Sequence, residues 1–231
     1  MSLGINRAWI ALIDNKTNKI ITGIDGINGS ASDKSGIFQA DVQSAMGLVG
    51  FNMTNMAGSQ TDIYGSNRVV WISQGKAAPQ GVLTANAFPH MVLNRMLGRK
   101  EKGNGGFEAA GQNGAYVALL VESAETFDIE EPLYVGFYKA IGQDPSQNMQ
   151  TNNASDQRQT NDVTFKAAER GTDGFGAWYY VDAPAFSKQK MFEDFFPGSD
   201  VTEFVNEGAD IAPGDHGHAS SNVTGTTTPV A

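Results

Sequence analysis

The clearest signal in the hydrophobic pattern is a pair of continuous apolar runs at 115–121 (AYVALLV) and 132–138 (PLYVGFY). Each run has the length of a strand and is apolar on both faces, which is typical of central strands covered on two sides. We therefore expect the two runs to form the middle of the main sheet. The expected core positions are Val117, Leu119, Val121, Leu133, Val135 and Phe137.

Shorter strands are expected around this pair. Residues 7–13 form an apolar run, and a turn-rich segment at 14–18 separates it from a second apolar stretch. Residues 162–168 alternate between apolar and polar side chains, as a strand with one buried face does. The segments 67–73 and 175–181 are rich in the β-branched and aromatic residues that favour strands.

Two short helices complete the pattern. One begins at Phe88-Pro89, repeats apolar residues at helical spacing and stops before Gly98. The other has an apolar face between 187 and 196 and ends at Pro197-Gly198. With about eight to ten short strands, these helices predict a mainly β or α+β fold, a sandwich with a flanking helix.

Two segments lack any sustained period. Residues 23–66 are rich in Gly, Asn and Ser and contain only weak strand signals near 36–42 and 46–53, so we interpret them as a long arm or loop. Residues 208–231 lose all aromatic side chains and become rich in Gly, Ser and Thr, which predicts a flexible tail. One domain is thus expected over 1–207.

Charge and composition exclude several classes of protein. The chain has 16 Lys and Arg against 25 Asp and Glu, a formal net charge of −9, whereas nucleic-acid binders use basic residues to neutralise phosphates. It has no cysteine, so neither disulfides nor sulfur-ligated zinc are expected. No apolar run approaches the ~20 residues of a membrane helix, and residues 1–14 do not fit a signal peptide. We expect a soluble protein of a reducing cytosol, with no membrane partner.

The candidate catalytic and metal-ligating residues do not form a recognisable site. His216 and His218 lie beside Asp215 in the expected tail, where no rigid surroundings would orient metal ligands. The acidic segment 122–131 could hold the carboxylate pair of a hydrolase, but a solvated hairpin tip or an acidic surface patch is the better explanation of five carboxylates on one loop. A second alternative is a virion module that binds carbohydrate or a surface through its tryptophans, Trp9, Trp71 and Trp178. We assign no catalytic residue, metal ligand or cofactor.

An arm that cannot bury itself within one protomer needs a neighbour, and open strand edges need covering, so the pattern favours an assembly subunit. Several segments also resemble a known family in their order and spacing. They are 38–41 (FQAD), 58–67 (GSQTDIYGSN), 88–98, 117–123 (VALLVES), 135–139 (VGFYK), 151–152, 160–165 (TNDVTF) and 191–198. Together they resemble the major tail proteins, or tail tube proteins, of long-tailed bacteriophages (siphophages) of Gram-positive hosts.

The resemblance implies a structural virion protein rather than an enzyme. Members of that family form hexameric rings whose subunits contribute strands to one inner β-barrel, and the rings stack into a tube that conducts the genome. The implied partners are other copies of the chain, the tape measure protein, the tail terminator and the distal tail proteins. DNA is expected to pass through without specific binding, and the tube to be assembled in the host bacterial cytoplasm. Residues expected at subunit or ring contacts are Phe38, Asp41, Phe51, Thr61, Asp62 and Tyr64.

Overall fold

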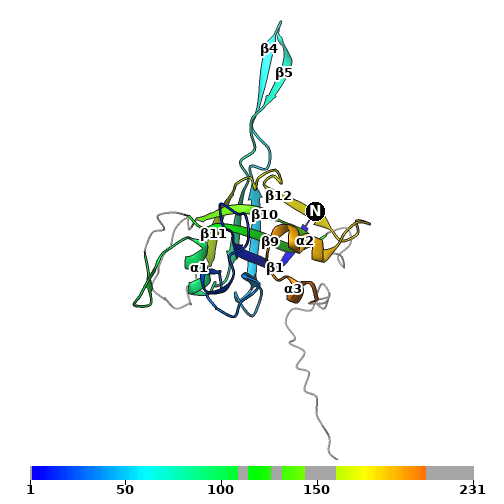
Figure 1. The fold of residues 1–231 in the computed structure, drawn as a ribbon. Coiled ribbons are helices and arrows are strands. Elements are labelled where there is room, and N and C mark those ends of the chain that lie inside the picture. Colours follow the sequence, from blue (N-terminus) through cyan, green and yellow to red (C-terminus); the bar gives the residue numbers. More distant parts are fainter. Residues whose placement is uncertain (1, 109–113, 126–131, 144–159, 207–231) are drawn as a thin grey trace, which may run out of the picture.

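The computed structural model describes residues 2–108, 114–125, 132–143 and 160–206. They form a mainly β body from which one long hairpin projects (Figure 1), so the predicted mainly β class is confirmed. In chain order the elements are β1 (Ser2–Leu12), the 3-10 helix η1 (Gly23–Asp25), β2 (Ile37–Ala40), β3 (Leu48–Thr54), β4 (Gln60–Gly65), β5 (Arg68–Gln74), β6 (Gln80–Ala85), α1 (His90–Met96), β7 (Glu101–Lys102), β8 (Gly106–Phe107), β9 (Tyr116–Glu125), β10 (Pro132–Gln143), β11 (Asn161–Ala167), β12 (Gly176–Tyr180), α2 (Lys188–Phe195) and α3 (Thr202–Asn206).

The main sheet has the strand order β2-β1-β9-β10-β11-β6-β3, and β12 also pairs with β10. All of these pairs are antiparallel. The strand β10 serves both halves, because its first part pairs with β12 and its last part pairs with β11. An irregularity in the register between Phe137 and Ala140 separates these parts, and such irregularities bend a strand. The bend lets β11, β6 and β3 cross over the half that contains β1 and β9.

Two apolar cores follow from this arrangement. The first core lies between the two halves of the sheet and includes Ile10 and Leu119 on one side and Leu83 and Phe165 on the other. The second core lies on the opposite face of β1, β9 and β10, beneath α2 and α3. Successive residues of a strand point to opposite faces, so β9 and β10 contribute to both cores. The six positions expected in the core are all buried, namely Val117, Leu119, Val121, Leu133, Val135 and Phe137.

The helices close the two cores. The apolar side of α1 covers one end of the first core, and the chain leaves that helix through Gly98 at a positive φ of 65°. The helix α2 begins at Ser187, whose side chain accepts a hydrogen bond from the Lys190 amide, and lays its aromatic face on the second core. Both helices lie where the sequence pattern predicts them.

A polar cluster ties α2 to the sheet. The Asp194 carboxylate accepts hydrogen bonds from the hydroxyls of Tyr138 (2.6 Å) and Tyr179 (2.7 Å) and pairs with Arg170 at 3.1 Å. The Arg170 guanidinium is buried and also lies 4.2 Å from the centre of the Tyr138 ring. Burial, followed by the hydrogen bond to Asp194, raises the pKa of the Tyr138 hydroxyl, so this group remains a donor at neutral pH.

The glycine-rich segment behaves differently from the arm expected at 23–66. Its first part supplies η1, β2 and β3 to the body, and only residues after Thr54 project from it. The projection also includes the segment 67–73, which folds as β5 of the hairpin rather than as a strand of the main sheet. After the turn at 14–18, only an isolated bridge between Ile13 and Ile20 forms where a second strand is expected. The expected tail at 208–231 lies outside the described residues.

The cluster at Asp194 leads to a stability prediction. Replacing Asp194 with alanine removes one of the two carboxylates that pair with the buried Arg170 guanidinium, the other being Asp173 at 3.0 Å. It also leaves the hydroxyls of Tyr138 and Tyr179 without their acceptor, so we expect the free energy of unfolding to fall by about 3 kcal/mol. Chemical denaturation followed by circular dichroism measures this change. The matched control is Glu193→Ala, which removes a neighbouring exposed carboxylate that pairs only with Gln189 in the described contacts and should change stability by less than about 0.5 kcal/mol. Equal effects of both substitutions would contradict the role given to the cluster.

Candidate assembly surface

The projecting hairpin is built by a tight turn of defined type. Residues Gly65 and Arg68 pair, and between them Ser66 and Asn67 both adopt positive φ, at 52° and 59°. Two successive left-handed residues make the turn whose twist matches that of antiparallel strands, and asparagine is among the residues that tolerate it best. The strands β4 and β5 therefore pair antiparallel along their length, and their register shifts once, between Ile63 and Tyr64.

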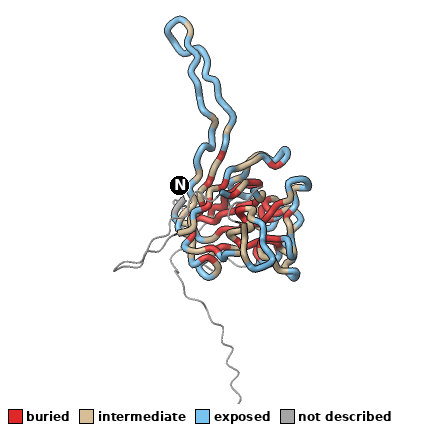
Figure 2. The backbone as a smooth tube through the Cα atoms, turned by 90° about the vertical axis from the view of Figure 1, so that its left-hand side faces the viewer, coloured by how far each residue is buried: buried red, intermediate tan, exposed pale blue. Residues whose placement is uncertain are grey.

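This hairpin has the apolar composition of a buried strand, yet its residues are exposed to solvent. Figure 2 shows it exposed along almost its whole length. Its exposed large apolar residues are Ile63 (48%), Tyr64 (69%), Val69 (43%), Val70 (58%), Trp71 (67%) and Ile72 (57%). An isolated two-stranded hairpin is only marginally stable in water, and monomeric proteins rarely expose such a continuous apolar surface. The composition of the hairpin therefore indicates a partner outside its own protomer.

The hairpin continues two strands of the body. It leaves β3 after Thr54 and returns to β6 at Gln80, and these two residues are partners in the antiparallel register. In Figures 1 and 2 it points straight away from the body, in line with the strands that carry it. The hairpin therefore projects in the direction of β3 and β6.

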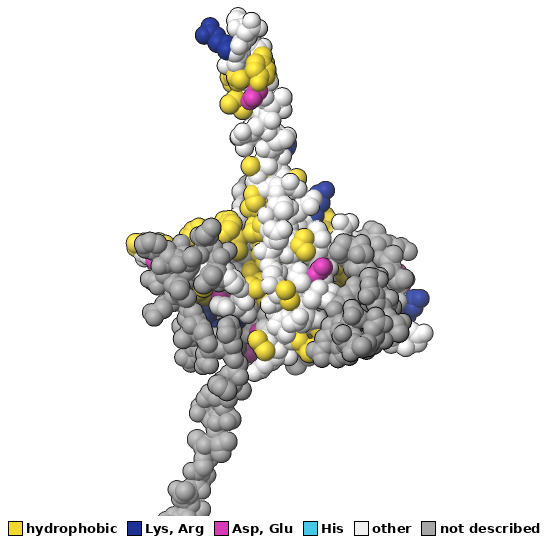
Figure 3. Space-filling view, turned by 180° about the vertical axis from the view of Figure 1, so that it is seen from behind, with side chains coloured by type: hydrophobic (Ala, Val, Ile, Leu, Met, Phe, Trp, Pro, Cys, Tyr) yellow, Lys and Arg dark blue, Asp and Glu magenta, His cyan; other side chains and the backbone are white. Residues whose placement is uncertain are grey.

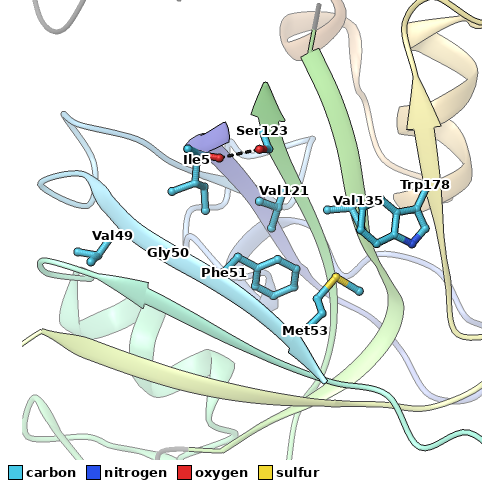
Figure 4. A pocket seen from close by; sticks show the side chains of 10 residues that line it. Ile5, Val49, Gly50, Phe51, Met53, Val121, Ser123, Val135 and Trp178 are labelled. Carbon is cyan, nitrogen blue, oxygen red and sulfur yellow. Dashed lines mark hydrogen bonds between the residues drawn. The ribbon is translucent and has the colours of Figure 1, made fainter. Parts of the chain in front are cut away.

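Beside β3 lies an apolar groove of about 380 Å³. Figure 4 shows Phe51 and Met53 on β3 facing Val121 on β9 and Val135 on β10, with Trp178 of β12 at one side. None of the lining residues is charged, and they are Gly4, Ile5, Val49, Gly50, Phe51, Met53, Val121, Ser123, Val135 and Trp178. Among the strands that the structure describes, β3 pairs with β6 alone, so the groove follows an open edge of the sheet.

A glycine makes room for the ring of Phe51, which lines this groove. The rings of Phe51 and Phe137 meet edge to face, with their centres 6.1 Å apart. A Cβ atom at Gly81 would lie 2.7 Å from the Phe51 ring and 2.8 Å from the Phe137 ring, closer than real contacts allow. Only glycine at this position lets both rings pack on the strand beneath them.

The outer face of β3, β6 and β11 has a different character. Its residues form three cross-strand rows, Gly50–Thr84–Asp162, Asn52–Val82–Thr164 and Thr54–Gln80–Lys166. They are exposed or half-buried, and the one acidic and the one basic side chain balance each other. Figure 3 shows mostly uncharged surface running from the back of the body into the hairpin. This face is a polar sheet surface with almost no net charge.

The structure separates the six residues expected at contacts. Thr61, Asp62 and Tyr64 are exposed on the hairpin, and Phe51 lines the groove. Phe38 lies in the first core of its own chain. Asp41 begins the loop after β2. The Asp41 carboxylate accepts hydrogen bonds from the amides of Gln43 and Ser44, each at 2.8 Å, and so shapes the loop after β2. Burial acts to raise its pKa, but these hydrogen bonds outweigh it and hold the pKa below the usual value.

The sequence pattern did not single out Val69 and Val70 of the hairpin or Val49 and Trp178 of the groove as contact residues. For the first pair a signal exists, because Ser66-Asn67 between two runs of strand-forming residues is a hairpin pattern. No comparable signal exists for the groove, since its residues come from five strands far apart in the sequence.

The tryptophans do not form a common site. Trp9 is fully buried, packs edge to face on Phe192 at 5.0 Å and donates a hydrogen bond from its indole nitrogen to Gln39. Trp71 lies on the hairpin and Trp178 at the groove. The expected carbohydrate site made of all three is therefore not assembled within the protomer.

The acidic segment offers no described catalytic pair. Glu122 is buried, with its carboxylate 3.7 Å from the Arg7 guanidinium, whereas residues 126–131 lie outside the described part of the chain. Among the described residues, no group of three or more acidic or histidine side chains could hold a metal ion. The same residues include no helix long and apolar enough to cross a membrane. His216 and His218 also fall outside them.

The exposure of the hairpin gives a direct spectroscopic prediction. In the unassembled protein, Trp71→Phe should remove the larger part of the acrylamide-quenchable tryptophan fluorescence, because Trp71 is 67% exposed, Trp178 is 48% exposed and Trp9 is fully buried. The quenchable emission that remains should come from Trp178, and a further Trp178→Phe substitution should leave only the protected emission of Trp9. The free energy of unfolding should change by less than about 0.5 kcal/mol. The control Trp9→Phe should keep the quenchable fraction and lower stability. A Trp71 that is already protected in the monomer would show that the hairpin folds back.

Comparison with known proteins agrees with these surfaces. No curated protein matches the chain. A family model described as phage tail tube protein matches residues 1–203, from the first strand to α3, with the hairpin and the groove inside the match. Since the match covers most of the chain, this protein belongs to the phage tail tube protein family and is a structural component of the virion tail tube.

Proposed function

We propose that the chain forms closed rings, hexameric as the family resemblance implies, and that the rings stack into the tube that conducts the genome from capsid to host cell. The hairpin is the observation that carries this proposal, because six large apolar side chains on it are 43–69% exposed in the described protomer. Contacts between identical copies supply a partner for them, and a contact that joins different surfaces of successive copies builds a filament.

The outer face of β3, β6 and β11 is the proposed wall of the bore. A wall that conducts DNA must avoid a set of phosphate contacts, since each basic contact strengthens salt-dependent binding. This face meets that requirement, as Asp162 and Lys166 are its only charged side chains and they offset each other. Pairing between copies at the open edge of β3 would continue the sheet around the ring and remove an edge prone to aggregation.

The hairpin is the proposed link between rings. About ten residues separate Thr54 from the turn, and at ~3.4 Å per strand residue the hairpin reaches about 35 Å beyond the body. That distance exceeds the length of β3 itself, which has seven residues. The exposure of Thr61, Asp62 and Tyr64 on the hairpin supports the proposal that they contact another ring, and the position of Phe51 in the groove supports a contact with a second copy.

The remaining parts of the proposal rest on family membership. The tape measure protein would occupy the bore before the DNA, and the tail terminator and distal tail proteins would contact the two ends of the tube, all assembled in the host bacterial cytoplasm. The role is structural rather than catalytic, and it requires no cofactor. Residues 1–207 would act as the assembly domain and 208–231 as an appended tail.

Shortening the hairpin tests the stacking role. We expect a variant with residues 56–78 replaced by a short Gly-Ser turn to fold normally, because Asn55 and Pro79 still connect the paired ends of β3 and β6. Negative-stain microscopy should show no tubes, while the melting temperature stays close to that of the unmodified chain. A deletion that starts at residue 30 is unsuitable, since it removes β2 and β3 from the main sheet. Normal tubes from the shortened variant would refute the proposed link.

A charge substitution tests the assignment of the bore wall. Asn52→Arg adds one cation per subunit to the proposed wall, and we expect the assembled tubes to retain short duplex DNA in cosedimentation, less so as the salt concentration rises. Gln189→Arg adds the same charge to the exposed side of α2 and should leave DNA retention at the level of unmodified tubes. If the Gln189 variant retains DNA and the Asn52 variant does not, the wall lies on another face.

A further inference from the structure

The groove beside β3 is an apolar surface that no residue of the described ranges fills. Val49 at its rim is 55% exposed and Trp178 is 48% exposed, while Val121 and Val135 at its base are buried. A partner that entered this groove would have to be apolar, because none of the lining side chains could neutralise a charge.

The exposed face of the hairpin has the matching chemistry. Ile63 on β4 and Trp71 on β5 are direct cross-strand partners, so their side chains lie together on one face. The hairpin carries Asp62 and Arg68 as its only charged residues within β4 and β5, and neither belongs to this pair. Tryptophan is among the residues that most often anchor the centre of an interface.

We propose that the Ile63–Trp71 pair of one copy inserts into the groove of a second copy in the adjacent ring. This inference rests on the proposed stacking of rings and names the surface that receives the hairpin. The hairpin prolongs β3, and the groove lies alongside β3, so a copy displaced along the strand direction brings its groove next to the projecting hairpin. The reach of about 35 Å is enough to bring the pair over the groove of that copy, while the backbone edge of β3 remains available to a neighbour in the same ring.

A second copy fits better than an unrelated partner for a structural reason. The projecting pair and the groove are two different surfaces of one chain, so joining them leaves each copy with one free hairpin and one free groove. Such a head-to-tail contact repeats without closing and generates a filament. Burying both surfaces together also removes from water two apolar regions that would otherwise favour aggregation.

Chemical cross-linking tests the contact directly, because the chain has no cysteine of its own. Ser73→Cys places a thiol next to Trp71 on the same face of β5, and Val49→Cys places one on the rim of the groove. When the two single-cysteine proteins carry different tags and assemble together, a short bis-maleimide should join them in tubes but not in unassembled protein. The control pair is Ser73→Cys with Val42→Cys. Val42 is 71% exposed in the loop after β2, and we expect no cross-link between these two cysteines.

A second measurement does not depend on the geometry of the cross-linker. Val49→Glu should leave the melting temperature nearly unchanged because the side chain is largely exposed, yet raise the protein concentration needed for tube formation by at least about tenfold, since the carboxylate would be buried without a partner. Val42→Glu is the matched control and should assemble like the unmodified chain.

The outcomes separate this inference from the proposed function. If the unmodified chain forms no tubes in its own expression host, the proposed function itself fails. If tubes form but Ser73→Cys cross-links to Val42→Cys rather than Val49→Cys, or if Val49→Glu assembles normally, the rings stack through another receptor and the inference is overturned. If Val49→Cys is protected in tubes yet does not cross-link to Ser73→Cys, a neighbour in the same ring fills the groove, which overturns the inference as well.

Discussion

The packing of β9 against β10, with both of their faces buried, is the interaction on which the rest of the structure depends. Leu119 points into the core between the sheet halves, and Leu120, one residue later, points into the core beneath α2. Two layers are therefore fixed to the same pair of strands. Everything that faces outward, including β3, β12 and the hairpin, is positioned by this pair through a short chain of backbone ladders.

This arrangement separates folding from assembly. The described cores are completed by residues of one chain, so a protomer has the apolar burial that it needs to fold alone. The surfaces available for contact lie at the margins of the sheet, where β3 contributes Phe51 to the interior, Asn52 to the polar outer face and an unpaired backbone edge. One strand thus serves the core, the proposed wall and the proposed contact between copies, because alternate residues and the edge point in different directions.

How much the sequence could predict depends on where each residue finds its partner. The runs at 115–121 and 132–138 are buried within the protomer, so their apolar pattern led directly to β9 and β10. The run VVWIS has the same apolar pattern but lies exposed in β5. An apolar pattern indicates a surface that needs covering, but it does not say whether the same chain or another copy covers it. The glycines between 23 and 47 were interpreted as an arm, whereas several of them, Gly36 among them, supply the positive φ that compact turns of the body require. The groove could not be predicted, since it arises only when β3 and β12 are brought to the same side of the sheet.

The ladder of the hairpin does not reach the body without interruption. Between Thr54 and Gln60 on one side, and between Gln74 and Gln80 on the other, the chain belongs to no strand, and a single backbone hydrogen bond from Gly75 to Ser59 ties the two connectors together. Because so few backbone hydrogen bonds join the connectors, the β4–β5 hairpin can change its angle to the body while its own strands stay paired. If the rings are linked by the hairpins as proposed, the tube bends through small rotations at these connectors, and the strand pairing within each ring is not disturbed.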